Sequence, residues 1–322
     1  MRLSCNHIKS LYRPFYFARP FTCLLSISVF ILFFTVIRPA PAEEQPVTLE
    51  QTYGQISDKL ASVALRDCLD GGFILSGGYS NKRVPILVRE YGPMKNRKPR
   101  AKVLLVGGTH GDEYASVSVV FKWMQILNIH HSGLFHWIFI PLLNPDGLLQ
   151  SKSTRTNARG VDLNRNLPGP TWLEAGYGRW QGKAGRNPRY YPGPCPMSEP
   201  ETRFLVNIIN DFRPDVIVSL HSPLNLVDYD GPGKPPSSLG SLKLRRLGNF
   251  PGTLGNYGGV QNKTPVITIE LASSSRMPSG EEISSMWRDL VKWLTNNAPV
   301  EPLDGRIYTA QEDVLIDELE GE

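Results

Sequence analysis

The stretch from residue 103 to residue 127 constrains the fold more than any other part of the chain. Its apolar run, Val103 to Val106, is typical of a buried strand, and residues 113–127 have apolar positions at helical spacing. Two glycines after the run let the chain turn tightly between these elements. One helical turn then brings His110 and Glu113 to the same side of the junction. Taken alone, the pair is better explained as an ordinary polar strand end.

Predicted strands and helices alternate from residue 103 onward. The remaining elements expected from apolar periodicity are strands at residues 134–143, 216–220 and 266–271 and helices at residues 198–212 and 280–296. Residues 228–240 are rich in glycine, proline and serine and are expected to form a loop. The alternation predicts an α/β fold. We expect one domain, with residues 43–100 as its first part and residues 101–300 as its core.

Polar side chains stand at the ends of three of these strands. His221 follows the strand at 216–220, and Glu270 lies near the end of the strand at 266–271. In open α/β sheets, ligand sites form at the carboxyl ends of the strands. His110, Glu113 and His221 then provide a His₂Glu set for Zn²⁺ that leaves one coordination position open. A strand-end histidine or a salt-bridged Glu270 is a simpler explanation for each residue separately, but four coincidences at strand ends would be needed together.

The same set of residues indicates hydrolysis. Zinc lowers the pKa of the water that it binds to about 7, so a neighbouring Glu270 could take the proton as a general base. A cation near the attacked carbonyl would stabilise the developing oxyanion. Arg155 and Arg165, in the irregular polar stretch 154–166, are candidates for this role and for holding a substrate carboxylate.

Charge and hydropathy set the first 42 residues apart. The chain has a formal net charge of +5, and residues 1–42 contain five basic residues and no acids, so the remainder is formally neutral. This balance gives no reason to expect a nucleic-acid partner. The apolar run 21–37 before Ala40-Pro41-Ala42 predicts a signal peptide, with an uncleaved membrane anchor as the alternative. We therefore expect an exported protein that is periplasmic, anchored to the inner membrane facing the periplasm, or secreted.

Three further segments leave alternatives open. Residues 168–197 form a long loop rich in glycine, proline and aromatic residues, which is typical of a lid over a cleft or of a surface loop that packs on itself. Cys68 and Cys195 allow either one disulfide or two buried thiols. Residues 301–322 form an acidic tail that we expect to be disordered or loosely docked.

The order and spacing of these motifs resemble the zinc carboxypeptidase family over residues 72–298. The resemblance rests on His110, Glu113, His221 and Glu270 and on the motifs at 144–147, 160–166 and 198–202. It implies an eight-stranded mixed sheet with helices on both faces and one Zn²⁺ per chain. Within the family, the stretches 161–168 and 250–257 look most like the branch of murein peptide amidases.

Resemblance to that branch implies a substrate and roles for individual residues. The implied reaction is hydrolysis of the γ-D-glutamyl–meso-diaminopimelate bond of murein peptides. Arg155 would polarise the carbonyl and stabilise the oxyanion, and Asn164 and Arg165 would hold the carboxylate of the diaminopimelate residue. Tyr257, thirteen residues before Glu270, is a candidate substrate-binding residue, with packing as its alternative role.

Three other functions remain open at this point. A D,L- or ordinary carboxypeptidase would use the same zinc chemistry with a different side-chain pocket. An acyl-amino-acid deacylase would share the zinc set and the 162–165 pattern, but the motifs at 144–147 and 198–201 argue against it. A non-catalytic peptidoglycan-binding protein belongs to a different class. Such a protein would normally have lost a ligand or the base, whereas all four positions are filled here.

Overall fold

The computed structural model describes residues 46–95 and 98–298 of the 322-residue chain. The predicted signal peptide or membrane anchor and the acidic tail lie outside these described residues. Among the helices that are described, none combines the length and the apolar character needed to cross a membrane.

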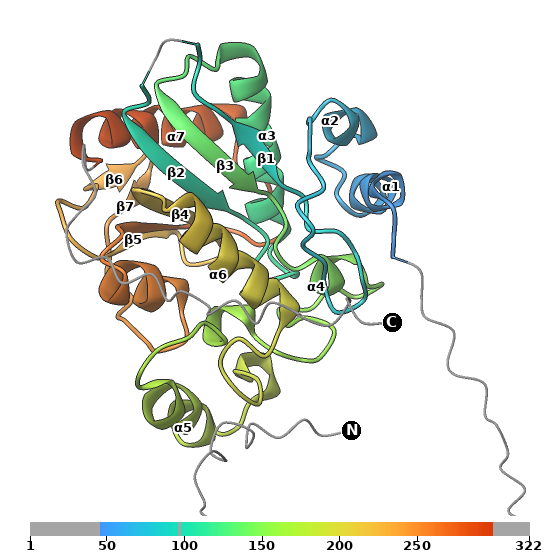
Figure 1. The fold of residues 1–322 in the computed structure, drawn as a ribbon, viewed down its shortest axis with the longest axis vertical. Helices are drawn as coiled ribbons and strands as arrows, with labels where there is room; N and C mark the ends of the chain where they lie inside the picture. Colours follow the sequence, from blue (N-terminus) through green and yellow to red (C-terminus); the bar gives the residue numbers. More distant parts are fainter. Residues whose placement is uncertain (1–45, 96–97, 299–322) are drawn as a thin grey trace, which may run out of the picture. The chain divides into compact units, whose positions relative to one another are not determined.

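A six-stranded mixed sheet forms the centre of the described chain (Figure 1). The spatial order of its strands is β1-β3-β2-β4-β8-β5, with parallel pairing from β3 to β8 and an antiparallel strand at each edge. The strands are β1 (Arg89–Tyr91), β2 (Ala101–Val106), β3 (Phe135–Ile140), β4 (Val216–His221), β5 (Leu226–Asp230) and β8 (Val266–Glu270). A separate hairpin contains β6 (Ser238–Leu239) and β7 (Leu242–Lys243). The α/β class is confirmed, and the eight described strands are divided between two sheets.

Helices cover both faces of the main sheet, as the resemblance implied. On one face, α3 (Tyr114–His130) and α7 (Gly280–Asn297) share a hydrophobic core with the strands. On the other face, α6 (Pro200–Phe212) packs through its apolar side, as Figure 1 shows. The remaining α-helices are the shorter α1 (Leu49–Lys59), α2 (Leu65–Leu69), α4 (Pro145–Leu149) and α5 (Gly178–Gln181).

The apolar run of β2 explains why this strand lies in the middle of the sheet. Val103 and Leu105 belong to the core under α3 and α7, whereas Leu104 and Val106 belong to the core under α6. Successive side chains of a strand point to opposite faces, so a strand that is buried on both faces must be apolar at every position. The covered sheet therefore selects a continuous apolar run, and the polar residues begin where the strand ends.

Glycines shape the turn that follows β2. Gly108 has a positive φ of 57°, a conformation that glycine adopts without steric cost. A Cβ atom on Gly111 would overlap the backbone of Gly147, so the loop carrying His110 lies directly against α4. The motifs at 107–113 and 144–147 therefore form one packed unit.

The expectation of a loop over residues 228–240 is wrong for its first three residues and for Ser238–Leu239, which form β6. Leu226–Asp230 form the edge strand β5, which pairs with β8 along its whole length. The segment is short and has aspartates at alternate positions, so its local sequence signal is weak. Pairing with a strand about forty residues away supplies the stabilisation that local sequence does not.

The two described cysteines are not joined by a disulfide. Cys68 is buried, and burial raises the pKa of its thiol to about 12. The expectation of two buried thiols is thus confirmed for Cys68, whereas Cys195 is half-buried.

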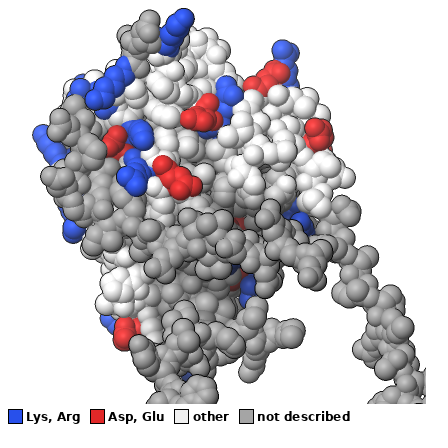
Figure 2. Space-filling model, in the orientation of Figure 1, with Lys and Arg blue, Asp and Glu red and all other residues white. Residues whose placement is uncertain are grey.

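Charged side chains are mixed in sign on the face drawn in Figure 2. Two buried carboxylates lie at the start of α6, where Glu199 and Glu201 are both fully buried. The Nδ2 group of Asn157 lies 2.8 Å from Glu199 Oε2 and 3.1 Å from Glu201 Oε2. Its Oδ1 accepts the backbone N–H groups of Arg159 and Val161. The buried pair therefore holds the loop that carries the candidate site residues Arg155, Asn164 and Arg165.

Burial raises the pKa of Glu201 from 4.5 to about 7. The unfolded chain therefore loses this proton at lower pH than the folded protein does, and the free energy of unfolding must fall as pH rises between these values. E201Q keeps a neutral side chain. In urea denaturation, the free energy of unfolding of E201Q relative to that of the wild type should rise by about 2–3 kcal/mol from pH 5 to pH 8. This size follows because one pKa unit corresponds to about 1.4 kcal/mol. The exposed control E281Q should follow the wild type, and a wild-type to E201Q difference that is the same at both pH values would contradict this account.

Candidate active site

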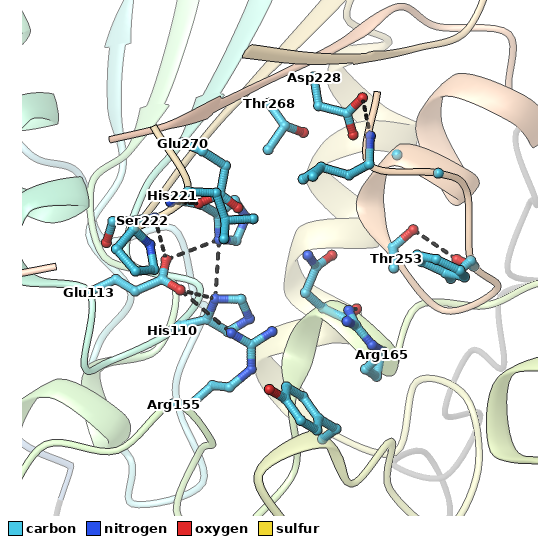
Figure 3. Close-up of a pocket in the computed structure, with 18 of the residues that line it drawn as sticks. His110, Glu113, Arg155, Arg165, His221, Ser222, Asp228, Thr253, Thr268 and Glu270 are labelled. Carbon is cyan, nitrogen blue, oxygen red and sulfur yellow. Dashed lines mark hydrogen bonds and ion pairs between the residues drawn. The ribbon is translucent and has the colours of Figure 1, made fainter. Parts of the chain in front are cut away.

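Three potential metal ligands converge at the carboxyl ends of β2 and β4 (Figure 3). His110 lies in the loop after β2, Glu113 directly precedes α3, and His221 is the last residue of β4. His110 Nδ1 lies 2.8 Å from Glu113 Oε1, and His221 Nδ1 lies 3.1 Å from Glu113 Oε2. All three side chains are buried. The structure therefore brings together the three residues that the sequence assigned to zinc.

The donor atoms of this group fit Zn²⁺. The Nδ1 atoms of His110 and His221 face each other at 3.1 Å, and one carboxylate oxygen approaches each of them. Tetrahedral ligands about 2.0–2.1 Å from zinc are themselves about 3.3 Å apart. Two imidazole nitrogens and a carboxylate converging at this spacing match a three-ligand zinc site. Among the described residues, this is the one group of three or more His, Cys, Asp or Glu side chains close enough to hold a metal.

Asp162 contacts the ring nitrogen of His110 that points away from Glu113 and His221. The His110 Nε2 atom lies 3.1 Å from Asp162 Oδ1, and Asp162 is fully buried. A proton on Nε2 that is donated to this carboxylate leaves Nδ1 unprotonated and directed at the other two ligands. Histidine ligands are held in this way by outer carboxylates in many metal sites. The sequence analysis placed Asp162 in a motif but assigned it no role.

Electrostatics keeps the buried acids of the site ionised. Burial would raise the pKa of Asp162, but the charges of Arg155 and His110 hold it well below its usual range. Burial acts in the same direction on Glu113, and the two histidines lower its pKa far below the usual range. Both acids are therefore anionic near neutral pH.

Glu270 ends β8 next to His221. The register of the parallel pair β4–β8 places these two residues side by side. Glu270 is 8% exposed, lines the cavity and accepts a hydrogen bond from Leu224 N at 3.4 Å. Burial raises the pKa of its carboxyl group, and the charge of His221 opposes that shift. A carboxylate with a raised pKa beside a metal site is suited to accept and return a proton.

Arg155 lies on the side of the potential metal ligands that is opposite to Glu270 (Figure 3). Its Nε donates to Asp162 Oδ2 at 2.9 Å, and its Nη1 lies 3.5 Å from Glu113 Oε1. Burial would lower the pKa of this guanidinium, but Asp162 and Glu113 raise it. The cation is thereby fixed at the edge of the cavity by two buried carboxylates.

Asn164 and Arg165 line the same cavity, which has a volume of about 310 Å³. Asn164 Oδ1 accepts the Leu254 N–H at 2.9 Å, so its amide N–H groups are left for other partners. Burial lowers the pKa of Arg165, and its Nη1 donates to the Asn164 carbonyl at 2.6 Å. Within the described residues, no carboxylate forms an ion pair with Arg165. A buried guanidinium without an ion-pair partner is a strong recognition group for an anion.

The long aromatic loop both packs on itself and borders the cavity. Trp172, Tyr177, Trp180 and Tyr191 form a chain of neighbouring rings. Tyr190 lines the cavity beside Arg155, and Arg189 forms a 2.6 Å salt bridge to Asp112 in the loop of His110. The aromatic loop therefore forms part of the rim of the cavity and is joined by this salt bridge to the loop that carries His110.

Tyr257 is not brought to the cavity. It is 1% exposed in the core under α6, and its hydroxyl donates to Asn210 Oδ1 at 3.2 Å. We therefore leave it out of the site and assign it to packing. Several residues that line the cavity were not predicted from the sequence, among them Arg189, Tyr190, Asp228 and Thr268. For Tyr190, membership of the aromatic loop was the available signal.

Comparison with known proteins adds independent information. A profile of the zinc carboxypeptidase family matches residues 74–237. Murein peptide amidase A of Escherichia coli strain K12 is 37% identical over 206 residues, which are 62% of this chain and 83% of that protein. The protein of the same name from Vibrio campbellii is 33% identical over 175 residues, which are 52% and 68% of the two chains.

Solved structures show the same likeness. The crystal structure of murein-tripeptide amidase MpaA from Escherichia coli O157 matches with a TM-score of 0.51 and 30% identity, over 67% of this chain and 90% of that one. Thrombin activatable fibrinolysis inhibitor matches in fold, with a TM-score of 0.56 and 17% identity over 78% and 74% of the chains.

A further relative by sequence is named inactive metallocarboxypeptidase ECM14, from Paracoccidioides brasiliensis strain Pb03. It is 33% identical over 149 residues, which are 39% of this chain and 24% of that protein.

Replacement of His221 by asparagine tests the metal site. After dialysis in zinc-free buffer, the full-length wild type should retain about one zinc per chain, as expected for a three-ligand site, when measured by mass spectrometry of the metal. H221N should retain far less, because one of the three donors is lost. H136N is the matched control, since His136 contacts Glu90 at 2.6 Å and is not part of the metal group. Stoichiometric zinc in H221N would contradict the assignment.

Proposed function

This chain belongs to the zinc carboxypeptidase family and is a metallopeptidase or amidase, and from that premise we propose that it hydrolyses the γ-D-glutamyl–meso-diaminopimelate bond of murein peptides. One observation carries the proposal. The converging residues His110, Glu113 and His221 lie in one cavity with Glu270 and with Arg165, a cation that forms no ion pair with a described carboxylate. The names of the relatives from Escherichia coli and Vibrio campbellii supply the substrate class.

In this mechanism each buried group of the cavity has one task. His110, Glu113 and His221 would hold a Zn²⁺ ion, which would make water acidic enough to lose a proton near neutral pH and would polarise a carbonyl. Glu270 takes the proton from the attacking water and returns it to the leaving amine. Arg155 stabilises the negative charge that develops on the carbonyl oxygen. Arg165 and Asn164 bind the carboxylate next to the leaving amine and so position the scissile bond.

A carboxypeptidase acting on other peptides is the second candidate. It would use the same metal ligands and base, and Arg165 with Asn164 would bind a terminal carboxylate in the same way. The two candidates differ in the bond that is cleaved and in the side chain that the cavity accepts. A non-catalytic peptidoglycan-binding protein is a third candidate, since the family includes relatives named inactive. The presence of both the complete ligand set and Glu270 favours catalysis.

The predicted signal segment adds a location to the proposal. If residues 1–42 direct export, the enzyme would meet murein peptides in the periplasm, whether it is released or stays anchored through residues 21–37.

The direct test uses L-Ala-γ-D-Glu-meso-diaminopimelate and the full-length protein. Mass spectrometry should detect free diaminopimelate, which should disappear when a chelator removes zinc and return when zinc is added. Trimming of ordinary peptides or murein tetrapeptides, with this tripeptide left intact, would instead assign the protein to the carboxypeptidase alternative.

Replacement of Glu270 by glutamine separates an enzyme from a binding protein. E270Q should retain zinc, because Glu270 is not one of the three ligands, yet kcat should fall by about 10²–10⁴, the usual contribution of a general base. Zinc content and turnover are measured on the same preparation. Normal turnover in E270Q would show that this mechanism is wrong.

A further inference from the structure

Charged groups of opposite sign line different sides of the cavity. Arg155, Arg165 and Arg189 come from the segment between α4 and α6, whereas Asp228 and Asp230 come from the edge strand β5. Figure 3 shows Asp228 and Thr268 beyond Glu270, on the side of the cavity away from Arg155. The cavity is therefore cationic at one end and anionic at the other, which suits a ligand that carries both charges.

The sheet register places Asp228 in line with the catalytic base. In the antiparallel pair β5–β8, Leu226 lies opposite Glu270 and Asp228 lies opposite Thr268. Side chains at alternate positions of a strand share one face of the sheet. Asp228 and Thr268 therefore lie on the same face as Glu270, one residue pair further into the cavity.

Asp228 is held in place and lacks a cationic partner. It is 5% exposed, and its Oδ1 accepts the backbone N–H groups of Tyr229 at 2.8 Å and Leu247 at 3.2 Å. No described basic side chain forms an ion pair with it. Arg246 is near enough to Asp230 to oppose the rise that burial and Asp228 cause in the pKa of Asp230, but it is exposed and does not line the cavity. A buried, oriented carboxylate without a counter-charge is stabilised by a cation that a ligand brings.

We infer that Asp228 selects a leaving amino acid whose side chain ends in a primary ammonium group, as in meso-diaminopimelate or lysine. The inference rests on the proposed function in one respect, namely that the leaving amino acid occupies this cavity with its carboxylate at Arg165. Its side chain then extends past Glu270 toward Asp228 and Thr268. A metal ion is a poorer occupant of this end, because Asp228 and Asp230 are not part of a described group of three metal-ligating side chains.

A neutral side chain of the same length should be rejected. It would cover Asp228 and exclude water without supplying a charge, which leaves a buried carboxylate unsatisfied. Selectivity at Asp228 therefore comes as much from the free-energy cost of burying it against a neutral side chain as from its attraction of an ammonium group.

The test compares three tripeptides, L-Ala-γ-D-Glu-X, in which X is meso-diaminopimelate, L-lysine or L-norleucine. Norleucine has the lysine chain without the ammonium group. For the zinc-loaded full-length wild type, kcat/KM should be about ten- to hundredfold higher for the two ammonium-bearing substrates than for norleucine, the size of one charged hydrogen bond. A preference for meso-diaminopimelate over lysine would show that its second carboxylate is also bound. Equal or faster cleavage of the norleucine substrate would overturn the inference.

The substitution D228N assigns the selection to this residue. Its amide oxygen can still accept the two backbone N–H groups, so the strand should keep its structure. D228N should lose about ten- to hundredfold in kcat/KM for the ammonium-bearing substrates and little or nothing for norleucine. D289N is the matched control, because Asp289 also accepts a backbone N–H, from Gly240, and does not line the cavity. An equal loss on all three substrates in D228N would overturn the assignment.

Binding measurements keep this inference separate from the proposed reaction. If all three γ-linked tripeptides stayed intact, calorimetry would be used to measure binding of free meso-diaminopimelate, lysine and norleucine to the zinc-loaded protein. Preference for the two ammonium carriers, lost in D228N, would support the inference even though the proposed reaction had failed. Norleucine binding as tightly as lysine would overturn it.

Discussion

Parallel pairing of β2, β4 and β8 is the constraint on which the rest of the structure depends. It brings the carboxyl ends of three strands to one edge of the sheet, where His110, His221 and Glu270 meet. A slip of one residue between β4 and β8 would turn Glu270 to the other face and away from the metal ligands. The edge strand β5 pairs with β8 in an antiparallel ladder, whose register places Asp228 beyond Glu270. The proposed metal ligands, the proposed base and Asp228 therefore all depend on how the strands of one sheet are paired.

The buried charges around the potential metal ligands are tolerated because each lies next to a group of opposite charge. Asp162 contacts both His110 and Arg155, and Glu113 contacts both histidines and approaches Arg155. Removal of one partner from such a set leaves an uncompensated charge, which is more costly than the pair itself. Arg165 and Asp228, which line opposite ends of the cavity, form no ion pair with a described side chain. The contrast separates the groups that build the site from those that are left for the substrate.

Local sequence was sufficient to predict the strand ends, because the buried strands are continuous apolar runs and the polar residues follow them directly. Four residues chosen on that basis, His110, Glu113, His221 and Glu270, do converge in the structure. Contacts between distant segments were not accessible in this way. β5 exists because it pairs with β8, and the role of Asp162 depends on a loop that returns to His110 from fifty-two residues away. Tyr257 matched a position in the chain, but position alone does not show whether a side chain points to a core or to a cavity.

Anomalous diffraction at the zinc edge, from crystals of the full-length protein, tests the central claim most directly. We predict one strong peak that marks a zinc ion bonded to Nδ1 of His110, the carboxylate of Glu113 and Nδ1 of His221. The bond lengths should be about 2.0–2.2 Å, as is usual for zinc. Such a peak would establish that the sheet edge is a metal centre with Glu270 beside it. A peak located elsewhere, or one bonded to Asp162 in place of these ligands, would contradict the account.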